Sequence, residues 1–96
     1  MKKNFTLTAK IWRWGGGLAS WHFIYVPRDL SEMLRHRFPS SAMIRCRYTL
    51  GETTWESTMF RNNRENNYLI PIKQKVRKQE GLMDGDEICI KIQILS

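Results

Sequence analysis

The chain has 96 residues, 42% of them hydrophobic and 26% charged, which is the composition of a globular protein and excludes a disordered, collagen-like or membrane-spanning chain. This length has room for one domain. Sixteen Lys and Arg residues against nine Asp and Glu residues give a net charge of +7, which favours an anionic partner without naming one.

The sequence contains no uncharged apolar run of about 18 residues, the length needed to span a bilayer. Lys2 and Lys3 are followed by polar residues instead of the apolar core of a signal peptide. We therefore expect a cytoplasmic protein that does not bind membranes. The two cysteines, Cys46 and Cys89, fall on opposite faces of the strands predicted for them, so we predict two free thiols.

The first part of the chain predicts a hairpin and a helix. Alternating apolar and polar residues predict a strand over 5–14 and a second over 21–26, joined through the glycines 15–17. Asp29 with Glu32 three positions later is typical of a capping box, and predicts a short amphipathic helix that ends before the next proline.

The remainder of the chain alternates strands with polar or helical segments. A polar stretch with four Asn residues predicts a loop, Gly81 predicts a left-handed helix cap, and Gly85 lies in a predicted tight turn. We expect strands over 42–50, 55–60, 68–72 and 88–94, a loop over 61–67 and a helix over 73–80.

Two parts of the sequence follow the same order of elements. A strand, Val26-Pro27, a helix and a strand in the first half match a strand, Ile70-Pro71, a helix and a strand in the second half, which indicates a degenerate internal duplication. Six strands and two short helices favour a small closed or nearly closed barrel that the helices cap. We therefore predict a mainly β fold with one barrel domain over residues 1–96.

A series of short motifs runs through nearly the whole chain: Ile11-Trp12-Arg13-Trp14-Gly15-Gly16, Trp21-His22-Phe23, Val26-Pro27, Trp55, Tyr68-Leu69-Ile70-Pro71, Val76-Arg77-Lys78 and Gly85-Asp86. With these motifs the sequence resembles the family catalogued as domain of unknown function 1905. The stretch from Tyr68 to Ile88 also resembles the strand, helix, turn and strand unit of AbrB and MazE type transcription regulators. The resemblance implies a double-split β-barrel in one chain, laid out like the AbrB-type barrel assembled from two chains. It implies no established activity.

The sequence offers few side chains suited to catalysis. His22 and His36 are the only imidazoles, and neither has a nucleophile at a recognisable spacing. We interpret His22 as a satisfied or partly exposed strand histidine. Because Cys46 and Cys89 have no Cys-x-x-Cys or histidine partner, we predict no metal and no cofactor. A non-enzymatic protein is the expectation, and a structure with His22 within hydrogen-bond reach of a carboxylate in a cleft would revive the hypothesis of an enzyme.

Our first functional hypothesis rests on clustered positive charge. Arg45 and Arg47 share the outer face of one predicted strand, and Lys75, Arg77 and Lys78 surround the second predicted helix. Such clusters are typical of contact with phosphate backbones, although charged faces are commonly only solvated. The hypothesis is a module, plausibly monomeric, that binds nucleic acid or another polyanion through these five residues.

The alternative hypothesis rests on aromatic residues. Trp12, Trp14 and Trp21 lie close to Tyr25, with positive charge between them. Such interleaving is used for base stacking on single strands, whereas a small barrel also uses bulky residues to fill its core or mouth, and this packing role is the more ordinary one. The alternative is a small-ligand or accessory module with a barrel-mouth pocket lined by these four residues.

Overall fold

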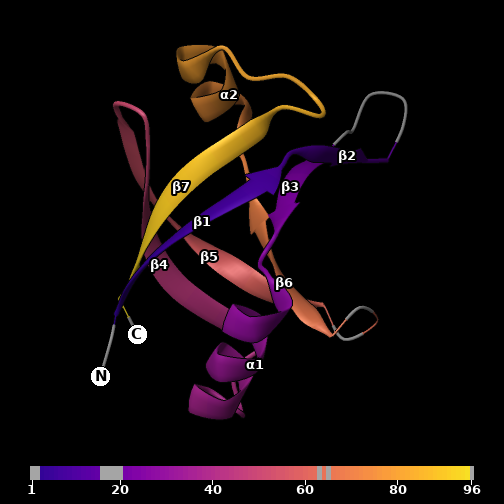
Figure 1. The fold of residues 1–96 in the computed structure, drawn as a ribbon, viewed down its shortest axis with the longest axis vertical. Coiled ribbons are helices and arrows are strands. Elements are labelled where there is room, and N and C mark those ends of the chain that lie inside the picture. The colour runs from indigo at the N-terminus through magenta and orange to yellow at the C-terminus, as the bar shows by residue number, and fades with distance from the viewer. Residues whose placement is uncertain (1–2, 16–20, 63, 65, 96) are drawn as a thin grey trace.

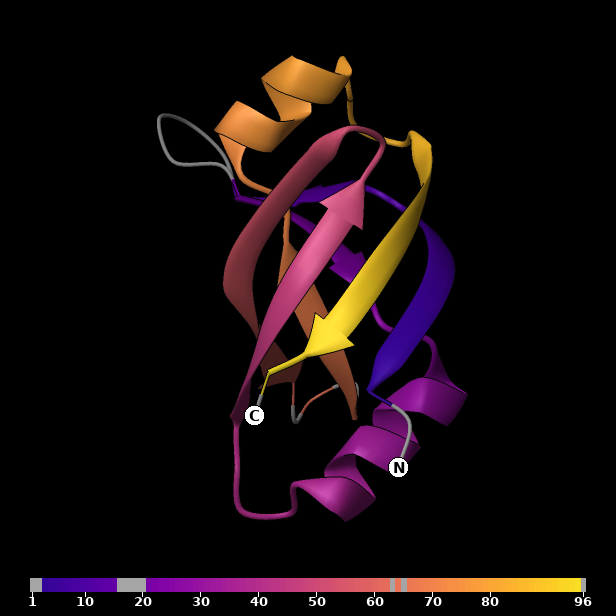
Figure 2. The ribbon, with the colours of Figure 1, turned by 90° about the vertical axis from the view of Figure 1, so that its left-hand side faces the viewer.

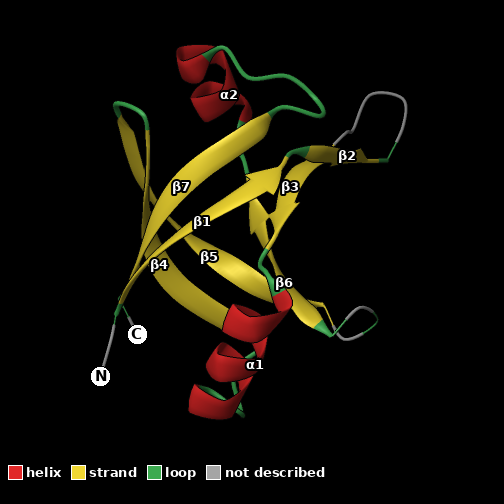
Figure 3. Cartoon of the chain, in the orientation of Figure 1, coloured by secondary structure: helices red, strands yellow, loops and turns green. Residues whose placement is uncertain are grey.

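The computed structural model describes residues 3–15, 21–62, 64 and 66–95, and it is mainly β, as predicted. One curled sheet carries two short helices (Figures 1 and 3). The elements are β1 (Asn4–Lys10), β2 (Trp12–Trp14), β3 (Trp21–Tyr25), α1 (Arg28–Arg37), β4 (Met43–Leu50), β5 (Thr53–Asn62), β6 (Asn67–Pro71), α2 (Gln74–Glu80) and β7 (Glu87–Ile94). Within these ranges, neither helix has the length and apolar composition needed to cross a bilayer.

The described sheet has seven strands, so the prediction of six was wrong. The difference arises at Ile11, where the first predicted strand divides into β1 and β2. The Ile11 N–H donates to the Asp86 carbonyl (2.9 Å), and the Ile11 carbonyl accepts from the Gly85 N–H (2.7 Å). Alternation does not reveal this change of partner, because Ile11 keeps its place in the pattern and is buried.

The order of the strands requires the sheet to curl. All neighbouring strands are antiparallel, in the order β1-β7-β4-β5-β6-β3-β2. β1 and β2 therefore stand at the two ends of the order, yet only Ile11 separates them in the chain. The two ends of the sheet must meet at this residue, and Figure 1 shows the resulting curl.

The predicted hairpin is present between β2 and β3, where Trp12 pairs with Phe23 and Trp14 with Trp21. Of the three glycines predicted to join these strands, Gly16 and Gly17 lie outside the described residues, as do residues 18–20.

Alternate residues of the strands point into the curl and form the core. The four isoleucines of β7 are buried, while the residues between them are exposed. β4 has the same pattern, with Tyr48 among its fully buried side chains. Burying one such aliphatic side chain contributes roughly 1.5 to 3 kcal/mol relative to leaving it exposed, so this shared interior is what holds the curl closed.

The strand registers relate the two halves of the chain by a local two-fold axis. Tyr25 pairs with Leu69 and Tyr48 pairs with Ile92, and each partner lies 44 positions further along the chain. The bounds of β4 and β7 differ by the same 44 positions. In an antiparallel pair, a residue that faces its own counterpart marks a two-fold axis. The duplication expected from the sequence is therefore visible in the pairing of the strands.

The first and fifth strands are equivalent in the same way. Phe5 of β1 pairs with Ile92, and Trp55 of β5 pairs with Tyr48, which is the counterpart of Ile92 in the other half. The Ile11 N–H donates to the residue that precedes β7, and the Arg61 N–H donates to Ala42, which precedes β4, at 2.7 Å. Each half thus contributes one long strand that changes partner midway, then a short strand, a helix and a final strand.

The helices lie at opposite ends of the sheet (Figure 2). α1 begins at Arg28 after Pro27 and has no side-chain cap, so the predicted capping box of Asp29 and Glu32 was wrong. Asp29 lies in the first helical turn instead, where its negative charge interacts favourably with the helix dipole. α2 ends as predicted at Gly81, whose φ of 65° is left-handed.

The predicted loop over 61–67 was too long, because β5 continues to Asn62 and β6 begins at Asn67. Arg61 belongs to the strand, and its guanidinium donates to the Tyr68 hydroxyl (3.1 Å) and the Phe38 carbonyl (2.9 Å). These bonds satisfy donors of the Arg61 guanidinium, although the polar character of this residue had indicated a loop.

The two thiols are free, as predicted, and differ sharply in environment. Cys46 is buried and Cys89 is exposed. Burial raises the pKa of the Cys46 thiol from 9.0 to about 11, although a hydrogen bond with Tyr48 opposes this. The Cys46 thiol is thus neutral and shielded at pH 8, which makes it a poor nucleophile.

We predict biphasic reaction of the native protein with Ellman's reagent at pH 8. Cys89 should react quickly, whereas Cys46 should react only as fast as the chain unfolds, because its thiol is buried and protonated. Protein in guanidinium should release two equivalents at once, and Cys89→Ser should abolish the fast phase. Two fast equivalents from native protein would contradict the burial of Cys46.

Candidate functional site

The aromatic residues singled out in the sequence lie on the outer face of the sheet and do not fill its interior. Trp14 is 62% exposed and Trp21 is 56% exposed, while Tyr25 is 40% exposed. Trp12 and Phe23 are half-buried on the same face. The packing role for these rings inside the barrel was therefore the wrong interpretation. We call the five residues Trp12, Trp14, Trp21, Phe23 and Tyr25 the aromatic face.

The rings of the aromatic face contact one another. Trp12 stacks on Tyr25 with 4.9 Å between ring centroids, and lies 5.3 Å from Phe23. Trp21 stacks on Phe23 at 6.4 Å. Strand alternation places these side chains on one side of β2 and β3, so they form one row of rings. Trp12, Trp21, Phe23 and Tyr25 are thus held by neighbouring rings before any ligand binds, and Trp14 lies beside them on β2.

A pocket of about 450 Å³ opens on this face. Three of the four predicted pocket residues, Trp12, Trp14 and Tyr25, line it, and Trp21 does not. The other lining residues come from β3, β5, β6 and the segment after β5: Phe23, Arg61, Asn62, Arg64 and Leu69. The pocket thus contains the Tyr25–Leu69 pair through which the two-fold axis passes.

The two walls of this pocket are equivalent in position and different in chemistry. Phe23 and Asn67 are 44 positions apart and are therefore counterparts. Phe23 pairs with Trp12, and Asn67 pairs with Asn62. Trp12 therefore corresponds to Asn62, and, two residues on, Trp14 corresponds to Arg64. One wall is aromatic and the other is polar and cationic. Such a pocket suits a ligand with a flat ring on one side and negative charge on the other.

The sequence did not identify Arg61 and Arg64 as functional residues, because they lie in the segment predicted as a loop. Arg61 is partly buried and holds Tyr68 and the end of α1 in place. Arg64 is exposed. Its backbone N–H donates to the Asn62 side chain at 3.2 Å. The one available signal was a pair of arginines in a stretch that otherwise holds four asparagines and one glutamate.

The structure separates the five predicted polyanion-binding residues. Arg45 and Arg47 lie together on the outer face of β4, where both contact Glu56, at 3.5 and 3.0 Å. Arg47 also donates to Gln93 (3.1 Å). This pair is therefore partly neutralised.

The other three predicted residues are on α2, at one end of the molecule (Figure 2). Lys75 and Lys78 are exposed there, and Lys75 lines a pocket beside the turn between β4 and β5. Arg77 is half-buried and turns towards β3, where its Nη1 lies 3.5 Å from His22 Nε2. The five residues thus do not form one surface.

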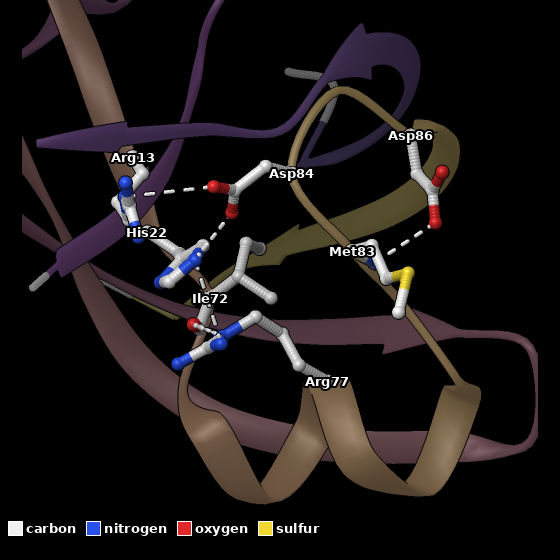
Figure 4. Close-up of polar contacts among 7 residues, drawn as sticks. All are labelled: Arg13, His22, Ile72, Arg77, Met83, Asp84 and Asp86. Carbon is white, nitrogen blue, oxygen red and sulfur yellow. Dashed lines mark hydrogen bonds and ion pairs between the residues drawn. The ribbon is translucent and has the colours of Figure 1, made fainter.

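His22 belongs to a polar cluster that the sequence did not predict (Figure 4). Its side chain is only 8% exposed, and its Nε2 lies 2.5 Å from Asp84 Oδ1. The other Asp84 oxygen contacts Arg13 Nε at 3.5 Å. Arg77 Nε also donates to the Ile72 carbonyl at 3.2 Å. The cluster joins β2, β3, α2 and the turn that precedes β7.

This arrangement supports a structural role for His22, in which its imidazole helps to hold β3 against the turn that precedes β7. A general base needs one imidazole nitrogen within reach of a substrate proton. Asp84 occupies Nε2, while Nδ1 is buried and has no partner among the described residues. Three described pockets are lined by other residues, and the described His, Cys, Asp and Glu side chains form no group that could hold a metal. The interpretation of His22 as a satisfied strand histidine therefore fits its Nε2, although Nδ1 remains unpaired.

Comparison with known protein families gives a match for this chain. The family that matches is described as "Domain of unknown function (DUF1905)", and the match covers residues 7–92. The chain belongs to this family. The matched span includes the aromatic face, its pocket and the His22 cluster. No curated protein matches the sequence significantly.

We predict that His22→Ala lowers the free energy of unfolding by about 1 to 3 kcal/mol, since it removes a buried side chain and leaves Asp84 without this partner. His36→Ala is the matched control, because His36 is exposed on α1, and should change stability by less than about 0.5 kcal/mol. Urea unfolding followed by circular dichroism measures both. Equal effects of the two substitutions would contradict the proposed role of the cluster.

Proposed function

We propose that this protein binds single-stranded nucleic acid, with bases stacked on the aromatic face and a phosphate beside Arg64. One observation carries the proposal. A row of contacting aromatic rings and a cationic wall border the same solvent-open pocket. Our first two hypotheses, a polyanion-binding surface and an aromatic pocket, therefore meet at one place, but with Arg61 and Arg64 as its cations.

Exposed aromatic area supports a binding role for this face. Leaving Trp14 and Trp21 more than half exposed forgoes the free energy that burial of a large ring provides. Phe60 and Met43, exposed by 37% and 55%, extend the same outer face, since Phe60 pairs with both Leu69 and Met43. A contiguous exposed apolar surface of this kind is typical of an interaction site.

Single strands suit this surface better than duplexes do. In a duplex the base faces are already stacked on one another, whereas an unpaired base offers its face to an aromatic ring. Each base stacked on a protein ring contributes about 1 to 3 kcal/mol and tolerates any sequence. The cations then contact the backbone, which supplies the salt-dependent part of the affinity.

The runner-up function is binding of one small aromatic anion in the same pocket. Trp12, Trp14 and Tyr25 would hold its ring, and Trp21, which lies outside the pocket, would contribute nothing. Trp21→Ala therefore separates the two proposals. It should weaken the binding of a single strand that follows the whole row of rings, and should leave the binding of a mononucleotide unchanged.

We also infer the finer fold and the location of the protein. The two-fold relation between its halves supports a double-split β-barrel in one chain, resembling the barrel that AbrB-type regulators build from two chains. The exposed free thiol of Cys89 supports a reducing compartment such as the cytoplasm.

We predict that fluorescein-labelled dT15 binds the protein in 50 mM salt and binds less tightly in 200 mM salt. Trp14→Ala should weaken binding by about 5-fold to 150-fold, the loss expected for one stacked base. Met33→Ala is the control, since Met33 is a large exposed apolar residue on α1, and should have no effect. Fluorescence anisotropy measures all three. No binding of dT15 at low salt, or tighter binding of a duplex, would refute the proposed function.

A further inference from the structure

We infer that the nucleic-acid site continues from the aromatic face around the outside of the sheet to a second, cationic subsite on β4 and β7, formed by Arg47 and Lys91. This inference rests on the proposed function and extends it, because it sets the length of strand that the protein recognises. A strand of two or three nucleotides would reach only the aromatic face. A longer strand would reach both.

The outer wall of the sheet between the two regions is not covered by a helix. α1 and α2 lie at its two ends, and Figure 2 shows the wall that carries β4 and β7 bare between them. The strand registers give the path across it. Leu69 in the aromatic pocket pairs with Phe60, and Phe60 pairs with Met43 at the start of β4. These three side chains point outwards in adjacent strands, so the apolar surface leads directly from the pocket to β4.

Beyond Met43 the outer face of β4 becomes basic. Alternation places Arg45 and Arg47 outwards along the same strand. The next row is formed by Thr49 with Lys91, and the row of Arg47 continues through Gln93 to Asn4. These rows surround a hollow of about 570 Å³. It is lined by Asn4, Phe5, Thr6, Arg47, Thr49, Lys91, Ile92 and Gln93.

The two cations of this hollow are counterparts in the duplicated fold. Arg47 and Lys91 are 44 positions apart and flank the Tyr48–Ile92 pair, through which the two-fold axis passes. The hollow and the aromatic pocket thus each surround one of the two pairs through which the axis passes. The axis pair of the pocket has aromatic rings on one side and polar and cationic side chains on the other, whereas the axis pair of the hollow is surrounded mainly by hydroxyl, amide and cationic side chains.

The charge of the second subsite suits phosphate. Among the described residues on this part of the wall, Arg45, Arg47 and Lys91 face one carboxylate, that of Glu56. Glu56 is shared by the two arginines, so a positive charge remains on β4, and the Lys91 charge adds to it. Threonine hydroxyls and the amides of Asn4 and Gln93 supply further donors for phosphate and sugar oxygens.

The spacing sets the strand length that the test requires. Leu69 and Arg47 are separated by two strand spacings of about 4.8 Å and by four residues of about 3.3 Å each along β4. The direct distance along the wall is therefore roughly 16 Å, which exceeds the reach of a trinucleotide whose bases are stacked on the aromatic rings. The trinucleotide dT3 cannot reach both subsites, and dT12 can.

The experiment compares these two oligonucleotides with wild-type protein and with the double variant Arg47→Gln/Lys91→Gln, by tryptophan fluorescence titration in 50 and 200 mM salt. The double variant should bind dT3 like wild type and bind dT12 more weakly. Loss of two phosphate contacts lowers the salt slope by about 1.4. The affinity ratio of wild type to variant for dT12 should therefore shrink roughly sevenfold between 50 and 200 mM salt.

The control is Lys75→Gln/Lys78→Gln, which removes the same charge from α2, away from the wall, and should leave the affinity for both oligonucleotides within about twofold of wild type. Equal weakening of dT3 and dT12 by Arg47→Gln/Lys91→Gln, or no weakening of either, would overturn the second subsite while the aromatic site stands. Binding of neither oligonucleotide by wild type would instead refute the proposed function, and the second subsite with it.

Discussion

The whole structure depends on one strand having two partners. The chain from Asn4 to Trp14 pairs first with β7 and then with β3, which are far apart in the order of the sheet. This is possible only if the sheet curls, and the backbone bonds of Ile11 to the turn before β7 fix the point of transfer. The curl in turn gives the sheet an inside, where alternating isoleucines exclude water. It also gives the sheet a continuous outside on which a ligand can lie.

The internal two-fold axis explains where pockets occur, and divergence between the halves explains what they contain. Both hollows on the wall surround residue pairs that the axis relates. An exact repeat would present the same side chains twice around each pair. Here Trp12 and Trp14 correspond to Asn62 and Arg64, so one pocket has unlike walls. The duplicated framework thus determines where the hollows lie. Substitutions on its outer face, where packing imposes few limits, determine which side chains line them.

Much of the fold follows from the sequence because its causes are local. Period-2 alternation fixed which residues of β4 and β7 face inwards, and with them the burial of Cys46 and the exposure of Cys89. Gly81 marked the end of α2 since it tolerates a positive φ. The signals that failed were also local. Asp29 resembled a helix cap, but Pro27 starts the helix earlier, and the polar character of Arg61 indicated a loop although long-range hydrogen bonds hold it in a strand.

The sequence by itself therefore determined the composition of the surface, the alternation of the strands, the duplication and the aromatic and basic residues from which a site could be built. Only the tertiary structure decided which of them meet. It placed Trp12, Trp14 and Trp21 outside the curl and separated Arg45 and Arg47 from the α2 residues. It also turned Arg77 towards His22, in a cluster with Asp84 that no sequence motif announces. The physical reason is that a period-2 pattern specifies two faces, while the direction of curl determines which face becomes the interior.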